Sequence, residues 1–252
     1  MSRSPSGQAR RNPLYAPETP RSPGDRLPVA RGPSARPAAG RSAPDGSPVE
    51  LYRLLPTLGE PELIHSAIRP GAEVLELGCG AGRVTRALVA LGHPVVAVDE
   101  SPEMLASVDA GEAVLSRIED LDLGRTFPAV VLMSNLVNVG DDHQRDAFLE
   151  ACRRHVDPYG TVLIERLDPG SVSGSFTARY GPFAIEVEQE RVGDELSGVV
   201  VYSLPDGRHW THRFERGRIL DDEALGEELR AAGLELRRFL DPKRRWCEAV
   251  PL

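Results

Sequence analysis

The chain has little cysteine, a single lysine and no long apolar run. Its 252 residues include three scattered cysteines, Cys79, Cys152 and Cys247, whose spacing suggests neither a disulfide framework nor a metal site. No stretch approaches the roughly 18 apolar residues that a membrane-spanning helix needs. These absences predict a soluble, cytoplasmic protein that holds no metal and makes no membrane contact.

Acidic residues outnumber basic ones outside the first 47 residues. These carry eight arginines and three acids, a net charge of +5, which leaves −13 on the other 205 residues because the whole chain carries −8. Proteins that act on nucleic acids need clustered Lys and Arg for phosphate contacts. The composition therefore argues against a nucleic-acid partner and favours a small-molecule substrate.

The same first 47 residues differ from the rest in their ability to fold. They contain nine prolines and show no apolar periodicity, so they cannot bury enough surface to offset the entropy of ordering. We expect a disordered arm over residues 1–47 and one domain of ordinary size over residues 48–252.

The most informative segment is a glycine-rich turn between an apolar strand and a helix. It reads Val-Leu-Glu-Leu-Gly-Cys-Gly-Ala-Gly-Arg-Val-Thr from Val74 to Thr85, and Asp99 ends a second apolar run seventeen residues after Gly82. This spacing is typical of a βαβ unit, in which glycines let a ligand approach the main chain and a carboxylate binds ribose hydroxyls. The two features together predict a nucleoside-binding site.

A dinucleotide site is one alternative. Its fingerprint is G-x-G-x-x-G, but in the register that begins at Gly78 the last position is Arg83. A nicotinamide-dependent oxidoreductase would also need a catalytic Tyr-Lys pair or an equivalent, and the single lysine is Lys243, near the C-terminus. The sequence therefore gives this alternative little support.

The segment from Glu76 to Gly82, an acidic residue followed by x-G-x-G-x-G, resembles the first motif of class I S-adenosylmethionine-dependent methyltransferases. Later motifs of that family, in the same order, are similar to Val95–Leu105, Ile118–Leu121, Phe127–Asn138 and Tyr159–Glu165. The resemblance runs from Tyr52 to about Leu234. It implies transfer of a methyl group to an amine nitrogen or hydroxyl oxygen of a small molecule, as in methyltransferases of bacterial specialised metabolism.

The resemblance also implies a set of cofactor-binding residues. Glu76 would orient the glycine loop or the ammonium group, Asp99 would hold the ribose, and Ile118 would flank the adenine. Two positions depart from the family pattern: Arg117 and Pro128 stand where many relatives carry aspartate. The full set of expected cofactor residues is Glu76, Gly78, Cys79, Gly80, Gly82, Asp99, Glu100, Ile118, Glu119, Met133 and Ser134.

Candidate acceptor residues follow from the chemistry of methyl transfer. An amine acceptor needs little beyond positioning, whereas a hydroxyl usually needs a base. Of the two histidines in one late strand, His212 shares a face with Trp210, and Glu165 either faces the pocket or caps a surface strand. The expected catalytic residues are His212 and Glu165, with Tyr180 and His209 as further bases; the expected substrate contacts are Tyr52, Asn135 and Asn138.

Apolar runs that alternate with helical segments predict an α/β fold. Because strands and helices alternate, we expect a doubly wound, seven-stranded, Rossmann-like methyltransferase sheet that is completed by a last helix and a closing strand pair. Strands are expected near residues 73–77, 95–98, 112–116, 129–133 and 161–165, and helices near residues 82–91, 102–109, 143–156 and 221–232.

After the fifth expected strand the pattern changes to short strands joined by turn residues. We expect three antiparallel strands over about residues 183–216, inserted as a β lid above the strand tips. The open edge of this lid could pair with a second copy in a homodimer. Before the first strand, Ser47–Ile68 has helical spacing broken at Pro56 and Pro61, and we expect it to cover the cofactor.

An alternative function is that of a binding protein without catalytic activity. Cofactor motifs survive without chemistry in some folds. The chain could therefore bind S-adenosylmethionine yet be a catalytically inactive interaction or regulatory protein. Retention of cofactor binding without turnover on any acceptor would favour that alternative.

Overall fold

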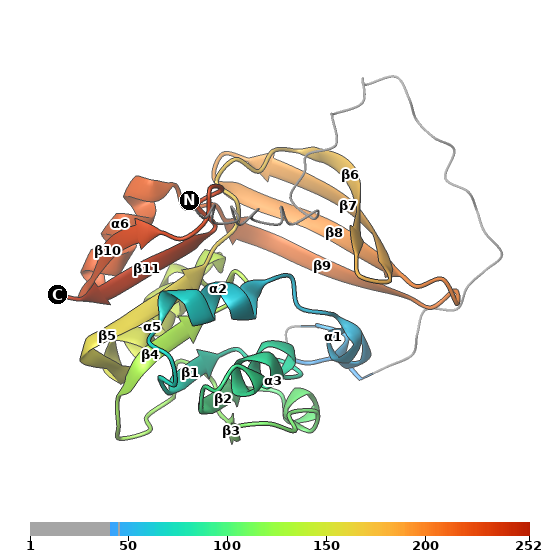
Figure 1. The fold of residues 1–252 in the computed structure, drawn as a ribbon. Helices are drawn as coiled ribbons and strands as arrows, with labels where there is room; N and C mark the ends of the chain where they lie inside the picture. The colour runs from blue at the N-terminus through green and yellow to red at the C-terminus, as the bar shows by residue number, and fades with distance from the viewer. Residues whose placement is uncertain (1–40, 45) are drawn as a thin grey trace, which may run out of the picture.

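Two β-sheets, with helices packed around the larger one, make up the computed structural model, which describes residues 41–44 and 46–252 (Figure 1). Most of the arm expected at residues 1–47 lies outside the described residues. Of its final residues, Ser42 forms an antiparallel bridge with Pro48, and Ser47 is buried.

The larger sheet has the order β10-β11-β5-β4-β1-β2-β3. Strands β1 to β5 run parallel, whereas β11 runs antiparallel to β5 and β10 antiparallel to β11. This confirms the predicted seven-stranded fold. Its strands are β1 (Val74–Leu77), β2 (Val95–Asp99), β3 (Glu112–Leu115), β4 (Phe127–Leu132), β5 (Val156–Glu165), β10 (Leu234–Phe239) and β11 (Trp246–Pro251).

The central strands are short apolar runs because both faces of the sheet are covered. One face packs against Ile64 and Leu88 in one apolar cluster, and the other packs against Phe148 and Leu225 in a second. The helices are α1 (Val49–Leu54), α2 (Glu60–Ala67), α3 (Arg83–Ala90), α4 (Pro102–Leu105), α5 (Asp142–His155) and α6 (Asp222–Ala231), with a 3-10 turn η2 (Leu136–Asn138).

The strand order places the site. Strand β1 lies between β2 and β4, so the chain leaves the carboxyl end of β1 toward one side of the sheet and the carboxyl end of β4 toward the other. Ligands of doubly wound sheets bind in the crevice at such a switch point. The glycine turn after Leu77 and the segment after Leu132 therefore meet at one crevice.

The segment before β1 forms two helices, as expected, although its details differ. The break spans Leu55 to Gly59, and Pro61 lies in the first turn of α2, where its missing N–H removes no helical hydrogen bond. Helix α4 ends at Leu105, four residues earlier than expected. In the described ranges no helix is long and apolar enough to cross a membrane.

The smaller sheet is inserted between β5 and α6, where the lid was expected. It has four antiparallel strands in the order β6-β7-β8-β9, not three. The additional strand β6 alternates Phe176, Ala178 and Tyr180 with polar residues, but the glycine and serine residues before it hide this pattern. The strands are β6 (Gly174–Tyr180), β7 (Phe183–Val192), β8 (Glu195–Ser203) and β9 (His209–Arg218).

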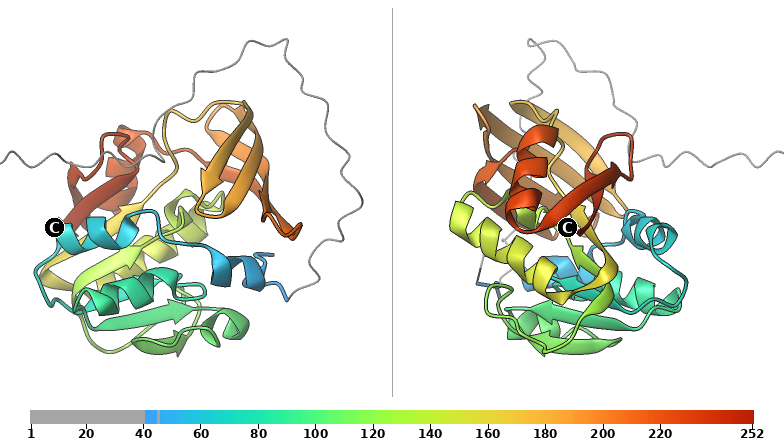
Figure 2. Two further views of the ribbon diagram at one scale, coloured as in Figure 1. Left: turned by 45° about the vertical axis from the view of Figure 1, so that its right-hand side comes forward. Right: turned by 90° about the vertical axis from the view of Figure 1, so that its left-hand side faces the viewer.

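One end of this lid packs on helix α1. Leu51 of α1 joins Tyr180, Phe183 and Trp210 of the lid in a buried apolar cluster. Figure 2 shows α1 below the lid sheet. Burial of such large side chains contributes about 1.5 to 3 kcal/mol each, so α1 anchors this end of the lid.

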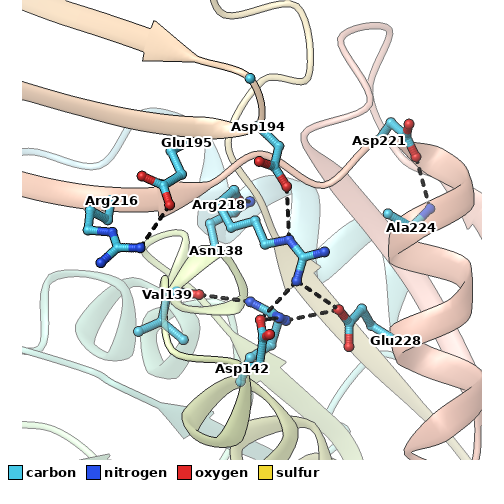
Figure 3. A network of polar contacts seen from close by, with 12 residues as sticks. Asn138, Val139, Asp142, Asp194, Glu195, Arg216, Arg218, Asp221, Ala224 and Glu228 are labelled. Carbon is cyan, nitrogen blue, oxygen red and sulfur yellow. Dashed lines mark hydrogen bonds and ion pairs between the residues drawn. The ribbon is translucent and has the colours of Figure 1, made fainter.

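The other end of the lid is held by a network of charged groups (Figure 3). Arg218, at the end of β9, pairs through Nη1 with Asp142 of α5 at 2.8 Å and through Nε with Asp194 of the β7–β8 turn at 3.2 Å. The buried Arg145 of α5 pairs through Nε with Glu228 of α6 at 3.2 Å. This network, the lid base, connects the lid to both helices on that face of the sheet.

The side chain of Asn138, in η2, links the end of β9 to the segment after β5 through two main-chain hydrogen bonds. Its Nδ2 donates to the Arg218 carbonyl oxygen at 2.6 Å, and its Oδ1 accepts from the Leu167 N–H at 2.7 Å. Beside it, a Cβ on Gly140 would lie 2.2 Å from the Arg216 carbonyl oxygen. The close approach of the segment after η2 to the end of β9 therefore requires glycine at position 140.

Replacing Gly140 with alanine tests this contact. The added methyl group must push the end of β9 away, so the Gly140→Ala variant should lose about 1 to 3 kcal/mol of unfolding free energy, measured by urea denaturation. Gly226→Ala is the matched control, because its added Cβ meets only the mobile end of the Arg230 side chain. That variant should be neutral, or more stable by up to about 1 kcal/mol; equal losses in both would contradict the contact.

Candidate active site

The loop after β1 uses backbone conformations that favour glycine. Gly78, Gly80 and Gly82 all have positive φ angles, of 74°, 55° and 74°. A Cβ on Gly78 would also lie 2.5 Å from Cδ1 of Leu136. The path of the loop thus favours glycine at all three positions, and packing against the segment after β4 adds a second constraint at Gly78.

Asp99, at the carboxyl end of β2, holds this loop. Its Oδ2 accepts a hydrogen bond from the Gly80 N–H at 2.8 Å, and its Oδ1 accepts from the Ser101 N–H at 2.9 Å. The carboxylate therefore lies directly beside the glycine loop. Glu100, the next residue, is exposed.

Glu76 provides a buried acid beneath the loop. Its side chain is 2% exposed, and its Oε2 accepts a hydrogen bond from the Thr85 hydroxyl at 2.6 Å. Burial raises the pKa of Glu76 to about 7, although Thr85 and the charge of Arg83 oppose the shift. Near neutral pH this carboxyl is thus poised to ionise when a positive group arrives beside it.

A small hollow opens over the loop and brings together most of the expected residues of the cofactor's methionine end. Ala81, Arg83 and Val84 also line it, and none of these three was expected from the sequence. The only available signal for Arg83 was its position immediately after the third glycine. The full lining is Tyr52, Glu76, Gly78, Cys79, Gly80, Ala81, Arg83, Val84, Met133 and Ser134.

The lining of the hollow carries one ionisable group of each sign. Glu76 is its one acid and Arg83 its one basic residue, among the lining residues that the structure describes. An α-amino acid carries one positive and one negative group. Cys79 is 6% exposed, and burial raises the pKa of its thiol, so it lies there as a small neutral side chain.

The expected adenine side lies farther along the sheet, at the loop after β3. Ile118 is 7% exposed and belongs to the apolar core. Glu119 pairs with Arg117 at 2.7 Å and accepts from Gln144 Nε2 at 3.1 Å. The side chain of Arg117 is thus held by Glu119.

The segment after β4 turns sharply beside the hollow. Ser134 and Asn135 both have a φ of 58°, a left-handed conformation that costs a non-glycine residue roughly 1 to 3 kcal/mol. Glu165 supports the turn, because its Oε2 accepts from the Ser134 N–H at 3.0 Å and its Oε1 from Arg245 at 2.8 Å. Glu165 is therefore buried beside the hollow, which it contacts through Ser134, and does not cap a surface strand.

Glu165 is electrostatically unusual as well. It is 7% exposed, and burial raises its pKa even though Arg245 favours the charged form. A buried carboxyl of this kind is a candidate proton acceptor.

The lid faces these groups with aromatic side chains. Tyr180 is 8% exposed, and burial raises the pKa of its hydroxyl, on which the charges of Arg83, Glu60 and Glu165 also act. The hydroxyl therefore lies near the charged groups around the loop. His212 is half-buried on the face that also carries Trp210.

The two asparagines that were expected to contact the substrate lie in different surroundings. Asn135 is half-buried beside the hollow, and its buried Oδ1 has no hydrogen-bond partner in the described part of the chain. Asn138, in contrast, is 2% exposed, and both ends of its amide are engaged by the main chain in the lid base. These contacts give Asn138 a structural role, in place of the expected contact with substrate.

Comparisons with known proteins agree with this arrangement. A family model described as a methyltransferase domain matches residues 74–160. A ubiquinone biosynthesis O-methyltransferase from Xanthomonas axonopodis pv. citri is 30% identical over 203 residues, which cover 76% of this chain and 74% of that protein. The chain belongs to the class I S-adenosylmethionine-dependent methyltransferases. S-adenosylmethionine is therefore the cofactor of this methyltransferase.

Solved methyltransferases share its fold. The CcbJ methyltransferase from Streptomyces caelestis superimposes with a TM-score of 0.65 at 22% identity, covering 81% of this chain and 95% of that one. The sugar N-methyltransferase KedS8 from a Streptoalloteichus species gives a TM-score of 0.62 at 20% identity, covering 90% and 99%. At these identities the likeness concerns the fold of this methyltransferase and not its acceptor.

The raised pKa of Glu76 predicts a pH dependence of stability. Because the folded pKa of about 7 exceeds the ordinary value of 4.5, the unfolded chain loses this proton first as pH rises. The folded state should therefore lose about 3 kcal/mol of stability between pH 4.5 and pH 7 from this group, relative to a variant that cannot ionise.

Urea denaturation of the cofactor-free wild type and of Glu76→Gln, from pH 4.5 to pH 8, measures this difference. Groups that titrate in both proteins cancel in the comparison. The wild type should lose stability relative to the variant as pH rises; a constant difference would contradict the raised pKa.

Proposed function

We propose that this methyltransferase transfers a methyl group from S-adenosylmethionine to a nitrogen or oxygen of a small molecule that is bound between the lid and the carboxyl ends of β1, β4 and β5. The observation that carries the proposal is the juxtaposition of the loop hollow with Glu165 and the aromatic lid. Ser134 lines the hollow and donates to Glu165, and the charges of Glu165 and Arg83 act on Tyr180 of the lid.

The cofactor supplies a methyl group on a positively charged sulfur, which makes the carbon reactive toward a lone pair. The acceptor's lone pair forms the new bond as the carbon–sulfur bond breaks, and the acceptor then loses a proton. The main tasks of the protein are to hold the acceptor in line and to exclude water, and positioning can supply roughly 7 to 11 kcal/mol. The lid, anchored at α1 and at the lid base, is suited to both tasks.

The lid surface favours a small acceptor over a nucleic acid. On β7 the outward side chains Glu186, Glu188 and Glu190 are exposed, while Phe183 and Ile185 alternate with them on the inward face. The three glutamates of β7 disfavour a phosphate backbone along that strand, whereas the apolar inward side of the lid suits a compact acceptor. The named activities of relatives, a ubiquinone-pathway O-methyltransferase and a sugar N-methyltransferase, support both acceptor atoms.

We propose that Glu165 is the base that takes the proton from a hydroxyl acceptor. Glu165 contacts a residue of the hollow directly, by accepting a hydrogen bond from the Ser134 N–H. Its pKa is raised by burial, which strengthens it as a base. His212 lies on the half-buried face of the lid and serves as the second candidate.

Asp99 is proposed to bind the ribose hydroxyls, because it already lies against the glycine loop. Replacing it with asparagine removes the charge that strengthens such hydrogen bonds, worth roughly 1.5 to 3 kcal/mol each. Asp99→Asn should therefore weaken S-adenosylhomocysteine binding by about 10- to 100-fold in titration calorimetry. Asp122→Asn is the matched control, since Asp122 also accepts a main-chain hydrogen bond, from Gly124, on an exposed turn; equal affinities in the two variants would contradict the ribose assignment.

Turnover is tested by incubating the protein with S-adenosylmethionine and a panel of amino sugars, other amines and phenols, with mass detection of the added methyl group. Glu165→Gln should abolish methylation of a phenol at neutral pH while an amine acceptor keeps most of its rate, since a neutral amine needs no base. Tight cofactor binding without any product would instead favour an inactive, S-adenosylmethionine-binding protein.

A further inference from the structure

Arg83 occupies a distinctive position at the hollow. It is the first residue of α3, directly after the third glycine, and its side chain is 18% exposed. Its Nη1 donates to Glu60 Oε1 at 2.7 Å and points toward the Pro56 carbonyl oxygen at 3.5 Å. These contacts hold the guanidinium against the start of α2 and the segment before it. They use one of its two terminal nitrogens.

The other edge of the guanidinium makes no hydrogen bond to the residues that the structure describes. A guanidinium carries five N–H groups in a planar fork. Among residues 41–44 and 46–252, no hydrogen bond engages Nε or Nη2 of Arg83. Since Arg83 lines the hollow, this edge is available to a ligand there. A paired Nε–H and Nη2–H edge matches the two oxygens of a carboxylate.

We propose that the Nε and Nη2 edge of Arg83 binds the α-carboxylate of the cofactor's methionine moiety. The inference rests on the assignment of S-adenosylmethionine as cofactor and adds a residue that the sequence motifs did not indicate. The hollow contains Glu76 for the ammonium group and Arg83 for the carboxylate, so the amino-acid end would be matched charge for charge.

Glu60 has a definite part in this arrangement. It is 7% exposed, and its ion pair keeps Arg83 charged and oriented before the cofactor arrives. Burial disfavours the charge of Arg83, but Glu60, Tyr180 and Glu165 outweigh it, so the pKa of Arg83 lies above its ordinary value. A preoriented guanidinium loses little freedom when it binds a carboxylate.

A purely structural role for Arg83, as a pin between α2 and α3, makes a different prediction. A structural defect weakens every nucleoside ligand, whereas loss of a carboxylate contact weakens only ligands that have a carboxylate. S-adenosylmethionine and decarboxylated S-adenosylmethionine share the nucleoside, sulfonium and amine and differ in that one group. Their ratio of dissociation constants therefore isolates the contact.

Titration calorimetry of both nucleosides gives this ratio for the wild type, Arg83→Gln and Arg86→Gln. Arg86 is the matched control: it lies on the same helix and donates to the Ala81 carbonyl oxygen at 3.0 Å, but it does not line the hollow. The wild type and Arg86→Gln should prefer S-adenosylmethionine by about 10- to 100-fold, and Arg83→Gln should prefer it by less than about 3-fold.

A wild-type preference that persists in Arg83→Gln would overturn the proposal. If Arg83→Gln fails to fold, as Glu60 is left unpaired, Arg83→Lys decides the question, since lysine keeps the charge but not the forked edge. Its preference should fall at least about 3-fold, and an unchanged preference would overturn the proposal. Failure of the wild type to bind either nucleoside would instead overturn the cofactor assignment itself.

Discussion

The active site depends on the hydrogen bond between the Asp99 carboxylate and the Gly80 N–H, which spans 2.8 Å. It ties the loop after β1 to the end of β2, and the positive φ angles of the glycines let the loop take that path. A charged acceptor on a main-chain N–H is among the stronger protein hydrogen bonds. This bond therefore stabilises the path of the loop, and Arg83, at the start of α3, is placed at the hollow by the same connection.

The lid is the second element of the site, and it is fixed at two ends. At one end the buried cluster of Leu51, Tyr180, Phe183 and Trp210 joins it to α1, and at the other Arg218 and Asn138 join it to the helices beneath. The proposed acceptor space is consequently bounded by packed side chains at one end of the lid and by ion pairs at the other.

Much of the fold could be predicted from the sequence because its signals are local. The strand, glycine turn and helix around Gly78, and the acid at Asp99, follow one another within about 25 residues, and their order indicated both the sheet and the cofactor. The contacts that sequence could not provide are long-range. Arg83 meets Glu60 across 23 residues, and Asn138 meets Arg218 across 80, so the roles of Arg83 and Asn138 emerge only in the folded chain.

A crystal structure of the protein with S-adenosylhomocysteine bound would test the central claim most directly. We expect the ribose hydroxyls within hydrogen-bond distance of Asp99, the amino-acid end in the hollow between Glu76 and Arg83, and the sulfur facing Ser134 and the lid. A nucleoside bound elsewhere, or a ribose that contacts neither Asp99 nor the glycine loop, would contradict the assignment of this crevice as the site of methyl transfer.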